Sequence, residues 1–358
     1  MTSMRRVVVY PGQIAVEAAD VPVPGPHEAL VRTLVTGVCG SDLHASRGRH
    51  PFVPLPYRPG HEVVGVIESV GSAVAGHPPG QRVIVEPDLP CWTCKMCTSG
   101  RENLCENLQF FGCGYPQGGM ADYFTLAANR LHPVPDALDD HTAALIEPLS
   151  TPVHAVRLAG EVAGRSVAVL GAGTIGLLTL AVLRAHQAGR VVVTDPLAAK
   201  RARATALGAD DAIDAGPPDV AGQVRRVLGG SADIVFDCVS IQSSVDQAIA
   251  IADKGGTVMV VGVPTREVTV PLPLVQDHQI RIQGSATYLP EDYREAAGLL
   301  VRGAVKLADF VTATRPLDQV AEAFELASSG HHIKILVTVG ERLGLTLPGS
   351  LSRARRCR

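Results

Sequence analysis

Aromatic residues are scarce: they make up 4% of the 358 residues, with a single tryptophan, which leaves little for stacking on nucleic-acid bases. Neither sign of charge is in large excess, because 32 basic and 35 acidic residues give a net charge of −3. A general binder of nucleic acid or of an anionic membrane needs a basic surface, so this charge balance argues against that class of protein. Charged residues, at 19%, are too few for a disordered chain, whereas hydrophobic residues, at 46%, suffice for packed cores. The composition therefore indicates a soluble enzyme or binding protein with no nucleic-acid partner and no membrane partner.

A convincing membrane segment is also lacking. The apolar run 7–10 that follows Arg6 stops at Pro11, so it is too short for the core of a signal peptide. The longest uncharged stretch, 166–183, reaches the length of a membrane span. Its first third is β-branched, its middle is rich in glycine and only its last third favours a helix, so it reads better as strand, turn and helix. We therefore expect a cytoplasmic protein.

The composition and the pattern of apolar residues change at about residue 148. Residues 1–148 are rich in valine, glycine and proline, with short strands between turns, which predicts a mainly β domain of barrel type. Beyond Pro148, apolar runs of strand length alternate with helical stretches until about Gly284, which predicts a parallel sheet wrapped by helices. The expected fold class is thus α/β, and about 150 residues per domain also favours two domains. The strands expected are 63–67, 82–86, 123–126, 167–170, 191–194, 234–237, 257–261 and 333–339, and the helices are 175–188, 197–207, 291–302 and 317–328.

A glycine-rich turn follows the apolar strand 167–170 and opens an apolar helix, which is the context in which a GxGxxG pattern indicates dinucleotide binding. The first glycine permits the tight turn, the second lets the backbone approach a pyrophosphate, and the third allows close packing of helix and strand. The helix N-terminus then offers free N–H groups to the phosphates. The residues predicted to bind the cofactor here are Gly171, Gly173, Thr174, Ile175 and Gly176.

The next apolar strand ends at Asp195, about 20 residues beyond the third glycine, where a carboxylate can accept both ribose hydroxyls and would repel a 2′-phosphate. This favours NAD over NADP. Lys200 could reach the same ribose, whereas the nearby Arg201 keeps NADP open as the alternative. A glycine-rich turn that binds no ligand is the remaining interpretation.

Four of the eight cysteines, Cys91, Cys94, Cys97 and Cys105, lie within fifteen residues. At such spacings four thiolates can close a tetrahedral shell around one zinc ion and leave no position for water, so the site would hold a lobe of about 87–113 in place without doing chemistry. In the absence of a secretory signal this is favoured over a disulfide framework. Four free thiols on one loop is the alternative.

A second set of possible metal ligands is dispersed. Cys39 lies in the segment 37–44, and His61 and Glu62 follow a proline–glycine turn. One thiolate, one imidazole and one carboxylate would leave a coordination position for water or substrate, as catalytic zinc requires. Taken singly each residue is ambiguous, and Glu147, just before Pro148, is either a further ligand or a surface glutamate.

With these motifs in order, the sequence resembles the zinc-dependent medium-chain alcohol dehydrogenases from about residue 5 to residue 340. Within that family it looks most like the sorbitol-type polyol branch, on the segments 85–87, 119–123 and 147–150. The zinc signature of the family, Gly-His-Glu-x2-Gly-x5-Gly-x2-aliphatic, is met at Gly60, His61, Glu62, Gly65, Gly71 and Val74.

The resemblance implies a GroES-like catalytic domain (1–148), a Rossmann NAD-binding domain (149–287), a return to the catalytic domain (288–340) and a basic tail (341–358). It implies two zinc ions per subunit and a homodimer or homotetramer, with the apolar segment 258–263 considered as a partner-facing strand. It also assigns roles to particular residues. These are Cys39, His61 and Glu62 as zinc ligands, Glu147 as a ligand directly or through water, Asp42 as the partner of His61, Ser41 as the hydroxyl that takes the substrate proton, His44 as the relay to solvent, and Val261, Gly262, Val263, Ser285 and Thr287 in segments lining the nicotinamide.

The expected function is therefore oxidation of a secondary alcohol, of polyol, cyclitol or aminocyclitol type, with hydride transfer to NAD. Two departures from the sorbitol-type pattern put sorbitol itself in doubt: Ala45 stands where an aromatic residue is usual, and Thr287 stands where an arginine is usual. Within the enzyme class the alternative is a primary-alcohol or aldehyde dehydrogenase. From another class, it is a non-catalytic nucleotide-binding protein.

Overall fold

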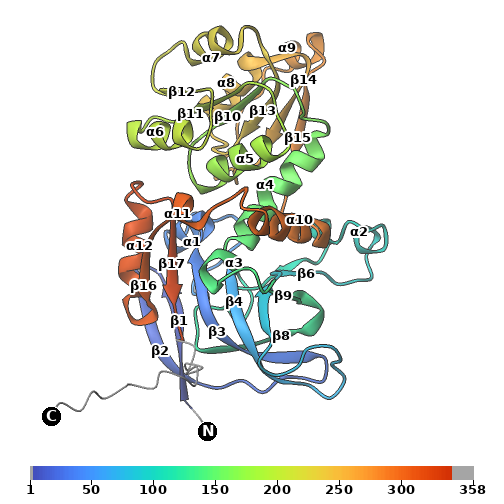
Figure 1. Cartoon of the computed structure of the whole chain (residues 1–358), viewed down its shortest axis with the longest axis vertical. Helices are drawn as coiled ribbons and strands as arrows, with labels where there is room; N and C mark the ends of the chain where they lie inside the picture. Colours follow the sequence, from blue (N-terminus) through green and yellow to red (C-terminus); the bar gives the residue numbers. More distant parts are fainter. Residues whose placement is uncertain (1–2, 341–358) are drawn as a thin grey trace, which may run out of the picture.

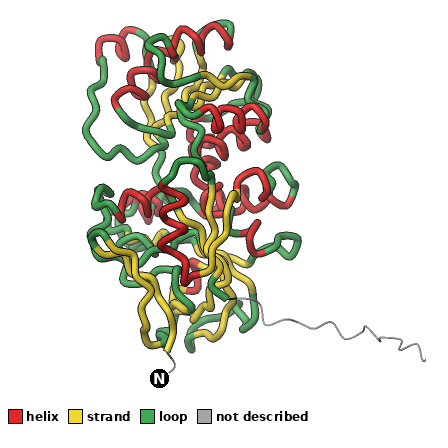
Figure 2. Tube along the Cα trace, turned by 90° about the vertical axis from the view of Figure 1, so that its left-hand side faces the viewer, coloured by secondary structure: helices red, strands yellow, loops and turns green. Residues whose placement is uncertain are grey.

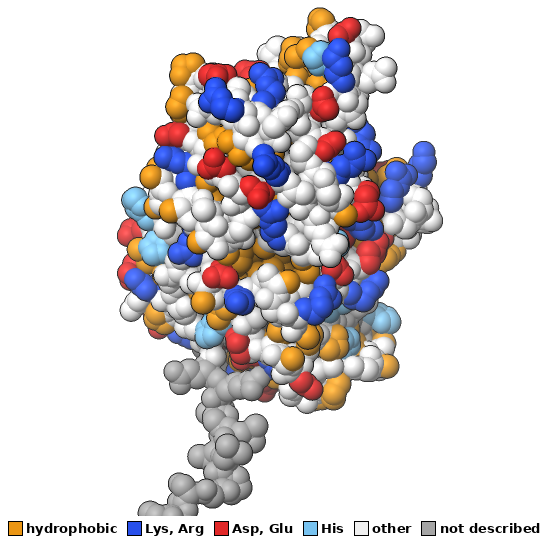
Figure 3. Space-filling model, turned by 45° about the horizontal axis from the view of Figure 1, so that its top comes forward, with side chains coloured by type: hydrophobic (Ala, Val, Ile, Leu, Met, Phe, Trp, Pro, Cys, Tyr) orange, Lys and Arg blue, Asp and Glu red, His pale blue; other side chains and the backbone are white. Residues whose placement is uncertain are grey.

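A computed structural model describes residues 3–340, and the tail predicted at 341–358 lies outside the described residues. Two sheets lie one above the other, and the chain passes from the lower sheet to the upper one and back (Figure 1). The expected α/β class, with a GroES-like region and a Rossmann-like parallel sheet, is confirmed. Within the described residues, no helix has the length and apolar character needed to cross a membrane. Basic and acidic side chains are mixed over the face seen in Figure 3, in keeping with the small net charge.

The lower sheet has seven strands in the order β16-β17-β3-β4-β5-β9, with β8 paired to β3. The last described segment returns to this sheet, because β17 pairs antiparallel with β3. The strands are β3 (Glu28–Val38), β4 (Val63–Val70), β5 (Arg82–Val85), β8 (Tyr123–Ala127), β9 (Leu131–Pro133), β16 (Val311–Pro316) and β17 (Lys334–Thr338), and two separate pairs are β1 (Ser3–Tyr10) with β2 (Gln13–Asp20) and β6 (Asp88–Leu89) with β7 (Gln109–Phe110).

The upper sheet has six parallel strands in the order β12-β11-β10-β13-β14-β15, so the chain starts in the middle and builds outward on both sides. Figure 2 shows helices flanking its strands. Alternate residues of β10 enter two different cores: Val167 and Val169 face one, Ala168 and Leu170 the other. Burial on both faces explains why these strands are apolar without alternation. The strands are β10 (Val167–Leu170), β11 (Val191–Thr194), β12 (Asp211–Ile213), β13 (Ala232–Asp237), β14 (Ala252–Val260) and β15 (Arg281–Gly284).

The helices of the upper part are α5 (Thr174–Ala185), α6 (Ala198–Ala206), α7 (Val220–Leu228), α8 (Gln242–Ile251) and α9 (Leu272–Asp277). Those of the lower part and the junction are α1 (Gly40–Ser46), α2 (Lys95–Thr98), α3 (Asp140–Ala143), α4 (Ile146–Ala159), α10 (Pro290–Val301), α11 (Leu307–Phe310) and α12 (Val320–Ser328), with short 3-10 turns at Glu102–Leu104, Ala128–Arg130 and Leu317–Gln319.

The junction between the sheets is built from α4 and α10, which pack against each other (Figure 1). A single hydrophobic core includes Leu34 and Ile84 of the lower sheet, Leu149 of α4 and Val167 of the upper sheet. The domain boundary predicted at 148/149 falls inside α4, so this helix belongs to the connection between the two parts.

The structure corrects the expectation that the segment 258–263 is a strand facing a partner subunit. Most of it lies in β14, between β13 and β15, where Val258 is 2% exposed and Met259 is fully buried. The edge strands of this sheet are β12 and β15. The apolar composition is the same for a strand buried on both faces of a parallel sheet and for a strand buried in a subunit interface. The sequence therefore does not distinguish these two environments.

Candidate active site

The first candidate ligand lies where β3 gives way to a short helix. Cys39 has extended backbone dihedrals and is the N-cap of α1. Its backbone N–H donates to Asp42 Oδ2 at 3.0 Å, and the hydroxyl of Tyr57 donates to Asp42 Oδ1 at 3.2 Å. The buried Asp42 carboxylate therefore fixes the turn that presents the Cys39 thiol.

Two further candidate ligands, His61 and Glu62, immediately precede β4. The donor atoms of Cys39, His61 and Glu62 all lie within 4.8 Å of one another. Among the described residues, His61 Nδ1 and Glu62 Oε2 are buried and have no hydrogen-bond partner. Because buried polar atoms in proteins are nearly always paired, these two atoms call for a ligand. The set of one thiolate, one imidazole and one carboxylate fits zinc with an open coordination position.

A lysine that the sequence analysis missed holds the other oxygen of Glu62. Lys334 of β17 donates from Nζ to Glu62 Oε1 at 2.5 Å and to the carbonyl of Val38 at 3.1 Å, and both side chains are buried. Close packing also explains Gly37, since a Cβ there would lie 1.7 Å from Glu62 Oε2. A signal was present in the sequence: Lys334 interrupts an otherwise apolar strand, where lysine is costly to bury without a counter-ion.

The surroundings of His61 are negatively charged. Burial lowers the pKa of His61, but Cys39 and Asp42 outweigh it and hold that pKa well above its usual value, so the site as a whole favours a cation. The expected pairing of Asp42 with His61 is not formed, because Asp42 is engaged by the Cys39 backbone and by Tyr57. The ring of Phe110 packs edge-on against His61, with centroids 5.5 Å apart.

Glu147 lies in the first turn of α4 and is 5% exposed, so it is not a surface glutamate. The hydroxyl of Tyr288 donates to its Oε1 at 2.5 Å. Burial raises the pKa of Glu147 to about 7, against the lowering effect of His61. Glu147 stands outside the group of three clustered donors, so its assignment as a zinc ligand stays a prediction.

The two residues expected to move the proton lie on α1. Ser41 and His44 are three residues apart, which places them on the same face of this helix. His44 is exposed near the end of the helix, and its pKa is lowered by partial burial and then by the cations Arg47 and Arg49. The structure therefore brings the hydroxyl and the imidazole to one helix next to Cys39, and their roles stay predictions.

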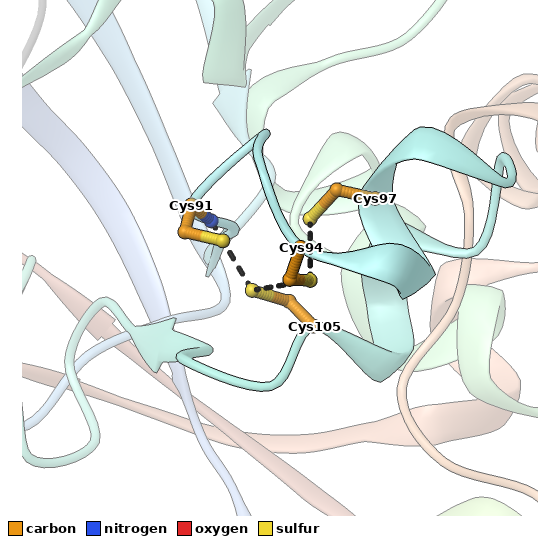
Figure 4. A group of neighbouring side chains, drawn as sticks. All are labelled: Cys91, Cys94, Cys97 and Cys105. Carbon is orange, nitrogen blue, oxygen red and sulfur yellow. Dashed lines mark hydrogen bonds between the residues drawn. The ribbon is translucent and has the colours of Figure 1, made fainter.

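The four clustered cysteines converge on one point of the 87–113 lobe (Figure 4). The Sγ atoms of Cys94 and Cys97 are 3.5 Å apart, and those of Cys94 and Cys105 are 3.9 Å apart. Hydrogen bonds from Thr93 lower the pKa of Cys91 to about 5, which favours the thiolate that metals bind. All four donors lie within 4.8 Å of one another, so they fit one tetrahedral zinc ion. All seven cysteines in the described part of the chain are free thiols.

The glycine turn has the geometry that a pyrophosphate requires. A Cβ at Gly176 would lie 1.8 Å from the carbonyl oxygen of Gly171, so only glycine lets the helix pack this closely. A Cβ at Gly173, the N-cap of α5, would meet nothing within 4 Å, which leaves open space at the helix N-terminus for the cofactor. Thr174 uses its hydroxyl to donate to the carbonyl of Ile333, so this predicted cofactor residue also ties the turn to the lower part of the molecule. Ile175 follows it in the first turn of α5.

Asp195 holds the glycine turn from the end of β11. Its Oδ2 accepts from the backbone N–H of Ala172 at 2.9 Å, and its Oδ1 accepts from Leu197 at 2.8 Å. Arg201 donates to the Asp195 carbonyl at 2.8 Å and pairs with Asp214 at 3.4 Å, so it is turned away from this carboxylate. Lys200, in α6, is half-buried, and its contact with the ribose stays a prediction.

The segments expected to line the nicotinamide follow neighbouring strands. Val261, Gly262 and Val263 follow β14, and Ser285 and Thr287 follow β15, so both lie at the C-terminal edge of the sheet, where open α/β sheets bind ligands. The hydroxyl of Ser285 is buried and has no hydrogen-bond partner within residues 3–340, and that of Thr287 lies near the buried Asp88. A cleft of about 840 Å³ lies nearby, and it is lined by Gly48, Arg49, 240–243 and 265–268.

Comparison with known proteins agrees with this arrangement. The alcohol dehydrogenase GroES-like domain family matches residues 25–136, and the zinc-binding dehydrogenase family matches residues 174–302. Fold and site thus define a dehydrogenase of the zinc-binding class, for which the family and the cysteine cluster support zinc and a nicotinamide cofactor.

Similarity to individual proteins shows to which branch of this class the chain belongs. Sorbitol dehydrogenase of Ovis aries is 34% identical over 336 residues, which cover 92% of this chain and 95% of the relative. The structure of 2R,3R-butanediol dehydrogenase from Bacillus subtilis superposes with a TM-score of 0.86 at 27% identity, covering 94% and 99% of the two chains. A protein described as a zinc-binding dehydrogenase from Sinorhizobium meliloti 1021, bound to NADP, gives 0.88 at 32% identity, covering 94% and 100%. The chain belongs to the sorbitol/polyol-like branch of the zinc-dependent medium-chain alcohol dehydrogenases.

Proposed function

We propose that this protein oxidises a secondary alcohol of polyol, cyclitol or aminocyclitol type and passes the hydride to NAD. The observation that carries the proposal is the convergence of Cys39, His61 and Glu62, with two buried donor atoms left unpaired. A structural metal site would close its coordination shell with four protein ligands, as the cysteine lobe does, whereas three clustered ligands leave a position for substrate.

Each part of the centre has a separate task in this proposal. Zinc bound by the three residues would supply a Lewis acid and the nicotinamide a hydride acceptor. Ser41 receives the proton from the substrate hydroxyl, and His44 carries it toward solvent, for which an exposed imidazole with a lowered pKa suits the task. Glu147, held by Tyr288, stands beside the three ligands, either as a fourth ligand or through a water molecule.

The preference for NAD is supported by Asp195. Its carboxylate lies at the end of β11 with both oxygens already fixed to backbone N–H groups, so it cannot turn aside for a 2′-phosphate. The arginine near it in sequence, Arg201, is already engaged by Asp214 and by backbone carbonyls. A relative of this fold that is bound to NADP makes the cofactor preference a matter for direct measurement.

We further propose a cytoplasmic enzyme with two zinc ions per subunit and self-association into a dimer or tetramer. Free thiols at all described cysteines suit a reducing compartment. The edge strand β15 carries Ile282, which is 41% exposed, and such an edge suits pairing with a second copy.

The test combines metal analysis with a substrate panel. Purified protein should contain two zinc ions per chain and should reduce NAD with polyols, cyclitols or diols faster than it reduces NADP. Faster turnover of unsubstituted primary alcohols would favour the primary-alcohol dehydrogenase instead. Zinc and NAD binding without oxidation of any alcohol would favour a non-catalytic nucleotide-binding protein.

A further inference from the structure

Besides Glu147, the helix α4 carries a buried histidine. His154 is 3% exposed and lies about two turns along the helix from Glu147. Its Nδ1 lies 2.8 Å from Asp292 Oδ2 of α10, and its Nε2 lies 3.4 Å from the side-chain nitrogen of Asn103 in the cysteine lobe. Asp292 and Asn103 are buried as well. The imidazole therefore joins α4, α10 and the cysteine lobe at one buried point.

The partners of His154 determine where the proton of its ring lies. The side-chain amide of Asn103 donates to the carbonyl of Ala286 at 3.0 Å, so the nitrogen of this amide also faces the imidazole. Nε2 must then accept from Asn103, which leaves the ring proton on Nδ1 to be donated to Asp292. Arg157 lies 3.1 Å from Nδ1 and donates to both oxygens of Asp292 at 2.9 Å, so this carboxylate is held from two sides.

The two partners of His154 hold the two ends of the segment 286–289. Asp292 Oδ2 accepts from the backbone N–H of Leu289 at 2.7 Å, just before α10 begins, and Asn103 holds the carbonyl of Ala286. Between these ends, Thr287 has a φ of 47°. A β-branched residue in this left-handed region is strained by about 1–3 kcal/mol, and such strain persists only where the surroundings impose it. The bonds at both ends are the constraint that imposes it.

The same segment reaches the proposed metal centre through Tyr288. The hydroxyl of Tyr288 donates to Glu147 Oε1 at 2.5 Å, and both side chains are buried. The segment 286–289 is thus tied to α4 twice, directly at Glu147 and through Asn103 and Asp292 at His154. A shift of the segment would change the position of the Tyr288 hydroxyl and of Thr287, which belongs to the residues expected to line the nicotinamide.

We infer that His154 is a positioning residue, which holds the segment 286–289 so that Tyr288 orients Glu147 and Thr287 faces the nicotinamide. This inference rests on the proposed function and adds to it a residue that acts only through its neighbours. Because His154 acts through two hydrogen bonds, the polar atoms of its ring are required and the volume of the ring is not sufficient.

Three variants separate the two hydrogen bonds from the packing of the ring. An asparagine amide reaches the place of the histidine Nδ1, and a glutamine amide reaches that of Nε2. His154→Asn therefore keeps a donor for Asp292, His154→Gln keeps an acceptor for Asn103, and His154→Phe keeps only the ring. The exposed His27→Asn is the matched control and should behave as the wild type.

Binding of NADH and of ADP-ribose to the zinc-loaded protein gives a readout independent of turnover. ADP-ribose is NADH without the nicotinamide, so only NADH senses the segment. His154→Phe should raise the Kd of NADH about tenfold and that of ADP-ribose by less than about twofold, since each lost hydrogen bond contributes about 0.5–1.5 kcal/mol. His154→Asn and His154→Gln, which each keep one bond, should raise the Kd of NADH by less. Calorimetric titration well below the unfolding temperature measures all four constants on folded protein, so a loss of stability alone would move neither ligand.

Turnover tests the link from His154 to Glu147. With the alcohol that the substrate panel identifies, His154→Phe should lower kcat/KM about tenfold, and Tyr288→Phe should lower it at least as much. The double variant should lose little more than Tyr288→Phe alone, because both residues act on one segment and their effects are not additive. Losses that simply add would overturn the action of His154 through Tyr288.

The outcomes separate the two proposals. If the wild type oxidises alcohols but the His154 variants bind NADH as tightly as His27→Asn does, or weaken NADH and ADP-ribose equally, the positioning role is overturned and the proposed function stands. If the wild type oxidises no alcohol, the proposed function fails, and the comparison of NADH with ADP-ribose still decides whether His154 positions the segment. If His154→Phe does not fold, His154→Asn and His154→Gln carry the same comparison.

Discussion

Lys334 and Glu62 form a buried ion pair that joins β17 to the cluster of Cys39, His61 and Glu62. The lysine Nζ lies 2.5 Å from Glu62 Oε1, while Oε2 of the same carboxylate packs against Gly37 and has no hydrogen-bond partner among the described residues. One oxygen is thus held by the protein, and the other has no partner of its own. The preceding residue, Ile333, accepts a hydrogen bond from Thr174 of the cofactor turn, so β17 touches both halves of the site.

Lys334→Met should lower the free energy of unfolding by about 3–5 kcal/mol, because it leaves the Glu62 carboxylate buried without its counter-ion. Urea unfolding in the presence of a chelator measures this without compensation by bound metal. The double variant Lys334→Met/Glu62→Gln should recover much of the loss, since it removes the orphaned charge. Lys254→Met, at an exposed position, should stay within about 0.5 kcal/mol of the wild type. A double variant no more stable than Lys334→Met alone would contradict the ion-pair account.

His44 should set the acidic limb of the pH–rate profile. The imidazole accepts a proton only when it is neutral, that is, above its pKa, and partial burial with Arg47 and Arg49 lowers that pKa. Removing one cation by Arg47→Ala should therefore raise the pKa of His44 and move the acidic limb of kcat to higher pH. Arg226→Ala removes the same charge from an exposed position on α7 and should leave the limb unmoved. His44→Ala should slow turnover mainly at low pH, and an equal loss at every pH would rule out the relay.

The two metal sites should respond differently to loss of a thiol. Cys94→Ser removes one of four convergent ligands, so one zinc ion should be lost and the midpoint of thermal unfolding should fall, with a smaller change in kcat of the remaining enzyme. Cys39→Ala should lose the other zinc ion and nearly all turnover while the protein stays folded. Zinc content, thermal unfolding and kcat measured together distinguish the two. Substantial activity of Cys39→Ala with one zinc ion per chain would reject its assignment as a ligand.

Local patterns explain how much of the fold could be predicted. The strands 167–170 and 191–194 have the predicted bounds, because apolar runs between turn residues mark buried parallel strands. The helix expected at 317–328 begins instead with a 3-10 turn at Leu317–Gln319. Helix ends depend on the last hydrogen bonds and on tertiary packing, which sequence periodicity does not report.

Pairings between distant segments account for what was missed at the site. The clustering of Cys39 with His61 could be predicted because each residue lies in a local motif. The roles of Lys334 and Tyr288 were not predicted, because each contacts a residue far away in the sequence. Lys334 pairs with Glu62, which is 272 residues away, and Tyr288 pairs with Glu147, which is 141 residues away. Such contacts follow from the order of strands in the sheet and the packing at the junction, and no local spacing encodes them.

Asn103 connects the cysteine lobe to the segment after β15. Its side-chain amide donates to the carbonyl of Ala286 at 3.0 Å, between Ser285 and Thr287. Asn103→Ala should leave that carbonyl without its partner and loosen the segment, raising KM for the alcohol by about tenfold. Zinc content should not change. Glu106→Ala, at an exposed position of the same lobe, serves as the control. An unchanged KM would show that the lobe does not position this segment.

Asp195 should decide between the two nicotinamide cofactors, and its hydrogen bonds define which variant is informative. Asp195→Ala removes the acceptors of both the Ala172 and the Leu197 N–H groups, so it disturbs the glycine turn as well as the ribose site. Asp195→Asn keeps one acceptor oxygen and removes the charge that repels a 2′-phosphate. For this variant, the ratio of kcat/KM for NADP to that for NAD should rise about tenfold or more, because hydrogen bonds to a charged group contribute roughly 1.5–3 kcal/mol. Steady-state kinetics with both cofactors measures the ratio, with Asp211→Asn, exposed in the neighbouring β12, as the control. A ratio equal to that of the wild type would mean that cofactor choice is made elsewhere in the cleft.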